Sequence, residues 1–367
     1  MPHDVLPPPL DPATALETRR RTQPLVGPAV ARAVGDVALA LTWRVVQARS
    51  KEVFLGAEPI PLTRLYYTSD DGWRAPLFVI PARPGSTGEP VLLAHGLGGS
   101  ALDFDLGPTS LARCLSDSGY TVYLFEHRAD RSALPPEHAT AFTADDLATR
   151  DLDAAVQAIR VHSGFPRCLV VGHGFGSQLV LLWLALIGGD EIAGAVLMSG
   201  AVRFTEDASA TRTWGQIAQL LPSSWVLPAR RLQQLASPFV ASGADLGSPG
   251  TDGALARAHL RHAAGDLHVG VLKQVGRWLS TGYLTDQTGR LNVVEALPRC
   301  AALVIEPDND PACPRGSAEP AAIALDAFFE RLSGGWGHLD PLLGTRAPAE
   351  IHPRIRNFLE ARRRACW

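Results

Sequence analysis

The chain has 367 residues, of which 46% are hydrophobic and 19% are charged, and its formal net charge is −3. These values are ordinary for a globular protein and give no electrostatic reason to expect a nucleic-acid partner. The five cysteines are odd in number and widely spaced, which argues against a disulfide framework and matches no metal site. We expect a cytoplasmic protein, because no apolar run reaches the roughly 18 residues of a membrane span and the first residues do not resemble a secretory signal.

Residues 1–60 are expected to form an arm and an amphipathic helix ahead of the main domain. The beginning of this segment is rich in proline and charge, which is typical of a poorly ordered arm. Over residues 28–48 apolar residues recur at helical spacing, interrupted by Arg32, Asp36 and Arg44. We expect this helix to pack on the main domain, and contact with a membrane surface or a second chain is the alternative.

Strands and helices then alternate along the chain, which predicts an α/β protein with a mostly parallel, doubly wound sheet. A hairpin is expected over residues 63–68 and 73–80, joined by a turn rich in Asp and Gly. Residues 90–96 form a continuous apolar run, as expected for a central parallel strand covered on both faces. Further strands are predicted at 121–126, 168–171, 193–198 and 301–305, and helices at 108–118, after a cap at Thr143, and at 351–364.

The alternation stops between residues 204 and 289. That stretch contains several helical pieces and a glycine-rich loop at 242–253. We predict that it forms a helical cap over the carboxyl edge of the sheet. The main domain would then consist of residues 61–203 and 290–367, with the cap inserted between them.

The stretch from 167 to 184 predicts a buried strand, a glycine-rich turn and an apolar helix. This is the setting of the nucleophile elbow G-x-S-x-G, in which a serine on a sharp turn attacks the substrate. Here the outer glycines are present, but a glycine occupies the place of the serine. Ser177 lies within the predicted helix and is expected to point away from the side of Gly174. His173 is adjacent to Gly174 but is expected to face a different direction at the sharp turn. Neither residue is therefore expected to replace the nucleophile. The turn residues are Gly172, His173, Gly174, Phe175 and Gly176.

The turn at residues 95–99 is the candidate for the oxyanion-binding loop. It follows a predicted central strand, and its glycines, with His95 and Gly96 at its start, let backbone amides point into a cleft. Acyl transfer needs two donors for the developing oxyanion. The candidate donors are the backbone amides of Leu97 and Phe175.

A carboxylate and a histidine suited to a catalytic pair follow later in the chain. Asp310 comes just after the predicted strand at 301–305, where it can reach a histidine on a neighbouring loop, and Asp308 is the alternative. His338 lies on a glycine-rich loop just before the last helix and is the candidate base. Asp340 is expected to order that loop or to cap a turn.

With these parts placed, the chain resembles the α/β-hydrolase superfamily over roughly residues 63–361. It is most similar to the acid-lipase-like branch and to hydrolase domains fused to long-chain cholesterol-oxidase-type flavoproteins. The resemblance implies ester or lipid-like substrates, a covalent acyl-enzyme and no cofactor, with Asp310 and His338 matching the family's acid and base. Gly174 departs from the family's serine, or from the cysteine of some polyester-synthase-like relatives. The similar segments are 95–128, 142–159, 272–284 and 335–344.

Three functions follow from these residues. The first is a binding protein whose cleft under the cap holds a small apolar or ester-type ligand. The second is a slow carboxylic ester hydrolase that uses Asp310, His338 and a water in the space at Gly174. The third is a non-catalytic partner subunit of an oxidoreductase or another complex. The presence of Asp310, His338 and both glycine turns favours the first two, because a scaffold has no chemical need for that set.

Overall fold

A computed structural model describes residues 63–204 and 216–366. The predictions for the N-terminal arm and for the amphipathic helix at 28–48 lie outside the described residues. Within these two described ranges, none of the helices is long and apolar enough to cross a membrane.

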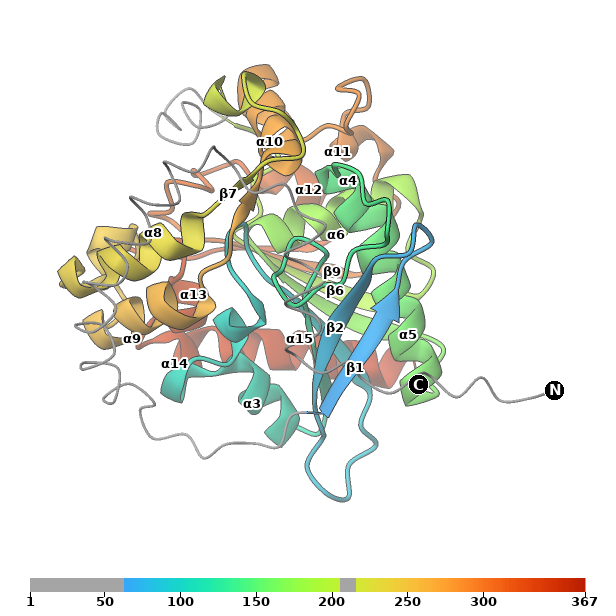
Figure 1. Cartoon of the computed structure of the whole chain (residues 1–367). Coiled ribbons are helices and arrows are strands. Elements are labelled where there is room, and N and C mark those ends of the chain that lie inside the picture. The colour runs from blue at the N-terminus through green and yellow to red at the C-terminus, as the bar shows by residue number, and fades with distance from the viewer. Residues whose placement is uncertain (1–62, 205–215, 367) are drawn as a thin grey trace.

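One sheet of eight strands runs through the molecule in the order β1-β2-β4-β3-β5-β6-β9-β10 (Figure 1). β1 and β2 form the predicted antiparallel hairpin, β2 also pairs antiparallel with β4, and the remaining neighbours are parallel. The predicted mostly parallel α/β sheet is therefore confirmed. The strands are β1 (Thr63–Thr68), β2 (Arg74–Ile80), β3 (Pro90–Ala94), β4 (Thr121–Phe125), β5 (Cys168–His173), β6 (Ile192–Met198), β9 (Ala302–Glu306) and β10 (Phe328–Arg331).

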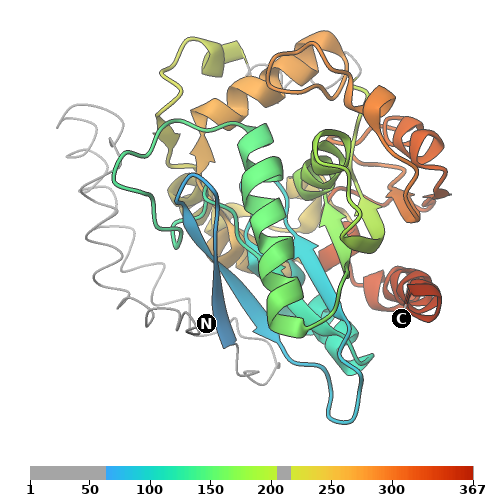
Figure 2. The ribbon, with the colours of Figure 1, turned by 90° about the vertical axis from the view of Figure 1, so that its right-hand side faces the viewer.

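Helices cover both faces of the sheet, as Figures 1 and 2 show. In β3, Val91 and Leu93 pack into a core shared with α3 (Leu111–Asp117) and α15 (His352–Cys366). Leu92 and Ala94 of the same strand pack into the opposite core. That second core is shared with α5 (Asp153–Ser163) and α6 (Phe175–Leu186). The strand is apolar at every position because side chains on both of its faces are buried.

Strand β10 has no counterpart among the predicted elements. It lies at the edge of the sheet and pairs in parallel with β9. Its residues are partly exposed, and Phe328 is 73% exposed. An edge strand without a buried face lacks both the apolar run and the strict alternation by which strands are predicted.

Helices and a two-stranded ribbon make up most of the described part of the segment between β6 and β9. The ribbon consists of β7 (Val226–Leu227) and β8 (Leu267–His268). We call the described residues within 204–289 the cap segment. It contacts the loops at the carboxyl ends of the strands, since the Gly265 amide donates a hydrogen bond of 2.6 Å to the Gly98 carbonyl. Its helices and turns are α8 (Ala229–Ala236), η5 (Ser237–Phe239), η6 (Gly243–Leu246), α9 (Gly253–Ala258), the π-helical η7 (His259–Ala263) and α10 (Val269–Thr281).

The remaining helices are short and connect the elements above. Thr143 caps α4 in a capping box with Asp146, as the sequence predicted for a cap at this position. The other short helices are η2 (Ala101–Phe104), η3 (Gly107–Thr109), α4 (Ala144–Asp146), the π-helical η4 (Leu147–Leu152), α11 (Val293–Ala296), α12 (Glu319–Leu325), α13 (Asp340–Leu343) and α14 (Ala347–Glu350).

Candidate active site

Gly174 lies at a sharp turn between β5 and α6. Its φ of 54° and ψ of −117° place it in the left-handed half of conformational space, which glycine adopts at little cost. A Cβ at Gly176 would meet the backbone carbonyl of Ala94, so helix α6 begins directly against strand β3. Ser177 is buried and donates a hydrogen bond of 2.9 Å to the Met198 carbonyl. The elbow has the backbone of a nucleophile turn but no side chain with which to attack.

The loops after β9 and β10 bring Asp310 and His338 together. The Nδ1 atom of His338 lies 2.8 Å from Oδ2 of Asp310, whose side chain is fully buried. The other Asp310 oxygen accepts hydrogen bonds from the amides of Ala312 and Cys313. This arrangement gives Nδ1 the proton and leaves Nε2 of His338 as the basic nitrogen.

Electrostatics set the charge of Asp310 and the basicity of His338. Burial alone would raise the pKa of Asp310, but the His338 charge, its hydrogen bond and the two loop amides lower it below its usual range. Burial alone would lower the pKa of His338, but the Asp310 carboxylate outweighs it and raises the pKa above its ordinary value. Asp310 is therefore ionised, and His338 is a stronger base than a free imidazole.

His338 faces the space that a serine side chain would occupy. A Cβ placed on Gly174 would lie 3.0 Å from Nε2 of His338 and 3.1 Å from its Cε1. The imidazole side chain is 25% exposed, so it remains accessible from the surface of the site. The residues predicted as base and as nucleophile position thus lie next to each other.

Asp308, the alternative acid, contacts backbone amides and not the His338 ring. Its carboxylate accepts hydrogen bonds of 2.7 to 3.1 Å from the amides of Gly334, Gly335 and Trp336. It orders the histidine loop and makes no hydrogen bond to the His338 ring. Asp340 also orders this loop, as expected, and its Oδ2 accepts from the amide of Gly337 at 2.7 Å. Asp340 also joins the loop to the cap segment through Gly250 and Thr251.

His173 has a role that its place in the elbow did not reveal. Burial and the neighbouring His338 charge lower its pKa to about 4, so the ring is neutral. Its Nε2 donates a hydrogen bond of 2.9 Å to the backbone carbonyl of His338. His173 therefore ties the elbow to the loop that carries the base. The sequence signal that could have indicated this role is the position of His173, a histidine directly before the nucleophile position.

Behind the turn at 95–99 lies a buried pair that sequence reasoning missed. Nε2 of His95 lies 3.1 Å from Oε2 of Glu126, and Oε1 of Glu126 accepts from the Ala101 amide at 2.8 Å. Burial opposes the charge on His95, but Glu126 outweighs it and raises the pKa of His95 to about 9. Glu126 thus connects His95, the first residue of the turn, to Ala101, the first residue of η2. The sequence signal for this pair is the polar triplet Glu126 to Arg128, which directly follows the apolar strand β4.

The candidate oxyanion donors are the amides of Phe175 and Leu97. Phe175 is the first residue of α6, where backbone amides have no partner within the helix. Leu97 lines two cavities. The larger has a volume of about 320 Å³ and is also lined by His338 and His173. A cavity of this size is adequate for a small ligand.

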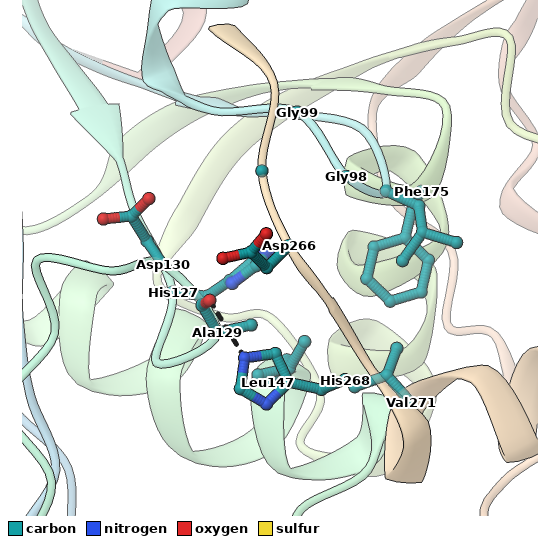
Figure 3. Close-up of a pocket in the computed structure, with 12 residues that line it drawn as sticks. Gly98, Gly99, His127, Ala129, Asp130, Leu147, Phe175, Asp266, His268 and Val271 are labelled. Carbon is teal, nitrogen blue, oxygen red and sulfur yellow. Dashed lines mark hydrogen bonds between the residues drawn. The ribbon is translucent and has the colours of Figure 1, made fainter. Parts of the chain in front are cut away.

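The smaller cavity, of about 20 Å³, is lined by Phe175, by the turn residues Gly98 and Gly99, and by the cap segment (Figure 3). Val271 and Leu147 form its apolar wall, and His268 from the cap bonds to the Ala129 carbonyl at 3.1 Å. It has room for about one water. The space that could take a substrate is therefore the larger cavity beside His338.

Comparisons with known proteins agree with this fold. A family model described as alpha/beta hydrolase fold matches residues 89–236. The human protein "Lipase member K" is 33% identical over 130 residues, which cover 31% of this chain and 32% of that protein. The "Poly(3-hydroxyalkanoate) polymerase subunit PhaC" of Haloferax mediterranei is 26% identical over 127 residues, covering 34% of this chain and 25% of that protein. The alignments thus span at most about a third of these relatives.

Solved structures share the fold over more of the chain. A structure titled "Lipase (Open form)" matches with a TM-score of 0.59 and 15% identity, covering 82% of this chain and 99% of its own. A putative aryl esterase from Burkholderia cenocepacia matches with a TM-score of 0.55 and 16% identity, covering 82% and 100%. The fold and the elbow, together with these matches, define an α/β-hydrolase. The chain is a member of the α/β-hydrolase superfamily, related to lipases and esterases.

Proposed function

We propose that this protein is a slow carboxylic ester hydrolase in which a water, activated by His338, attacks the ester directly. The observation that carries the proposal is the Asp310–His338 pair, whose basic Nε2 lies 3.0 Å from the Cβ position at Gly174. A protein that only binds a ligand has no need for a buried carboxylate that raises the basicity of a histidine facing its cavity. A purely structural subunit has no need for it either.

The chemistry would proceed in a single displacement. His338 Nε2 takes a proton from the water while the water oxygen attacks the ester carbonyl. Asp310 holds the Nδ1 proton and stabilises the imidazolium that forms. The amides of Leu97 and Phe175 would bind the oxyanion of the tetrahedral intermediate. Without a nucleophilic side chain, we expect an enhancement of roughly 10³–10⁴ over the reaction in water, far below that of a serine enzyme.

Removing the base is expected to abolish this activity. We expect the His338→Ala variant to hydrolyse p-nitrophenyl butyrate at least about 100-fold more slowly than the parent, because the water then lacks a general base. The exposed His138 provides a matched control, and His138→Ala should retain full turnover. Equal turnover in the parent and in a folded His338→Ala variant would refute the proposal. A captive ligand in native mass spectrometry, together with that result, would instead indicate a binding protein.

The pH profile provides a second test of the same pair. His338 acts as a base only when neutral, and Asp310 raises its pKa above 6.5. Turnover should therefore rise with pH, with its inflection on the alkaline side of 6.5. In Asp310→Asn the charge that raises this pKa is absent, so the inflection should move to lower pH. The rate at the plateau should also fall, because the amide of the substituted side chain no longer holds the productive tautomer of His338. An inflection that stays in place would show that Asp310 does not act on the titrating group.

A further inference from the structure

A second histidine–aspartate pair lines the same cavity as His338. Asp103 belongs to η2, which follows the turn at residues 95–99, the candidate oxyanion loop that we call the oxyanion turn. His259 is the first residue of η7 in the cap segment. His259 Nδ1 lies 3.1 Å from Asp103 Oδ1, and their side chains are only 10% and 3% exposed. Both residues line the cavity of about 320 Å³ together with His338. Both residues of this second pair thus line the cavity, and the first pair reaches it through His338.

Asp103 is built into the oxyanion turn. Its carboxylate occupies the place where a Cβ on Gly99 would lie, which explains why the turn has glycine at this position. Burial lowers the pKa of His338, and the charges of Asp310 and then of Asp103 raise it, so Asp103 acts electrostatically on the same site. Since Asp103 faces Nδ1 of His259, it orients the ring and leaves Nε2 as the nitrogen for a ligand.

The local backbone positions His259 relative to the turn. The residue begins a π-helical segment, a conformation that is rare and frequently found at functional sites. The chain that follows this segment is bonded to the oxyanion turn, from the Gly265 amide to the Gly98 carbonyl. The second pair is therefore fixed to the turn from both sides, through Asp103 and through Gly265.

We propose that His259 is the general acid that protonates the leaving alcohol, with Asp103 as its positioning residue. This inference rests on the function proposed above. In a serine hydrolase one histidine takes the proton of the nucleophile and then gives it to the leaving group within the same tetrahedral intermediate. When water attacks directly, His338 takes the proton of the water and can pass it on only to a leaving oxygen beside its own Nε2. A second imidazole on the cap side supplies the proton to a leaving oxygen that lies towards the cap.

The step balances as follows in atoms and electrons. The bond between the carbonyl carbon and the alcohol oxygen breaks, and its electron pair goes to that oxygen. The alcohol oxygen takes the proton from Nε2 of His259. Solvent then removes the proton that His338 accepted and returns one to His259. The products are a carboxylic acid and an alcohol, and one water is consumed.

This role predicts a substrate class, the esters of aliphatic alcohols. An alkoxide is a strong base and leaves readily only when it is protonated, whereas p-nitrophenolate leaves without a proton. General acid catalysis is therefore valuable for alkyl esters and nearly redundant for p-nitrophenyl esters. The dependence of the rate on the leaving group distinguishes a general acid from a residue that only supports the cavity.

The test compares ethyl butyrate with p-nitrophenyl butyrate, which share the acyl group. In His259→Gln, kcat/KM for the ethyl ester should fall by about 100-fold, while that for the p-nitrophenyl ester should change little. The matched control is His262→Gln, in the same π-helical segment but outside the cavity lining, and it should alter neither rate.

Each outcome of this comparison supports or overturns the role of His259 as general acid. An equal fall for both esters, as misfolding or a distorted cavity would produce, overturns the role of His259, and so does no fall for either. In both cases the hydrolase proposal stands if p-nitrophenyl turnover still depends on His338. If the parent shows no turnover of either ester that depends on His338, the proposed function fails and the general acid fails with it.

Discussion

Replacing Gly174 with serine is expected to raise esterase turnover by about 100-fold or more. The hydroxyl would lie beside His338 Nε2, in the position where this fold keeps its nucleophile. Hydrolysis would then proceed through an acyl-enzyme, with a burst of p-nitrophenolate equal to one per chain and a matching increase in protein mass. The gain should remain below that of a mature enzyme, because a Cβ 3.0 Å from the ring obliges His338 to move by a few tenths of an ångström.

Gly174→Ala is the matched control for this substitution. It adds the same Cβ on a backbone with a φ of 54°, so both variants should lose about 1–3 kcal/mol of stability. Alanine brings no hydroxyl, so its turnover should not exceed that of the parent. A folded Gly174→Ser variant without a burst would mean that the oxyanion turn or the His338 loop does not match the elbow.

The largest expected loss of stability comes from Arg128, which joins three parts of the core. Its guanidinium is 1% exposed and bonds to Asp151 at 2.7 Å and to Asp71 at 2.6 Å. Asp151 is fully buried in the π-helical η4, and Asp71 belongs to the turn of the β1–β2 hairpin. Arg128→Met would leave the Asp151 carboxylate buried without its counterion. We expect a loss of about 3–5 kcal/mol in the free energy of unfolding, measured by urea denaturation.

Two further variants separate the ion pair from packing. The double variant Arg128→Met with Asp151→Asn should recover part of the lost free energy of unfolding. Asparagine is uncharged, so position 151 then no longer holds a buried charge without a counterion. Arg150→Met removes a cation that is 38% exposed and pairs with Asp70, and should cost no more than about 1 kcal/mol. If Arg128→Met were as mild as Arg150→Met, the network would contribute little to stability.

The fold could be predicted from sequence because its signals are local. Apolar runs such as that of β3 mark strands buried on both faces, and the hairpin is marked by its Asp–Gly turn. Gly172 and Gly176 of the elbow are required by close backbone approach, to Ser177 and to Ala94, so their spacing can be recognised without knowing the partner. Strand β10 could not be predicted, because what places it at the sheet edge is its pairing with β9.

The candidate site was only partly determined by the sequence. The chain order of Gly174, Asp310 and His338, and the absence of a nucleophile, are properties of the sequence alone. Only the tertiary structure distinguished Asp310, at the His338 ring, from Asp308, two residues away and bonded to backbone amides. It alone brought His259 to Asp103, because no local pattern records contacts between residues distant in the chain. Such contacts depend on how the cap segment docks on the carboxyl edge of the sheet, which is set by long-range packing and not by the propensities of neighbouring residues.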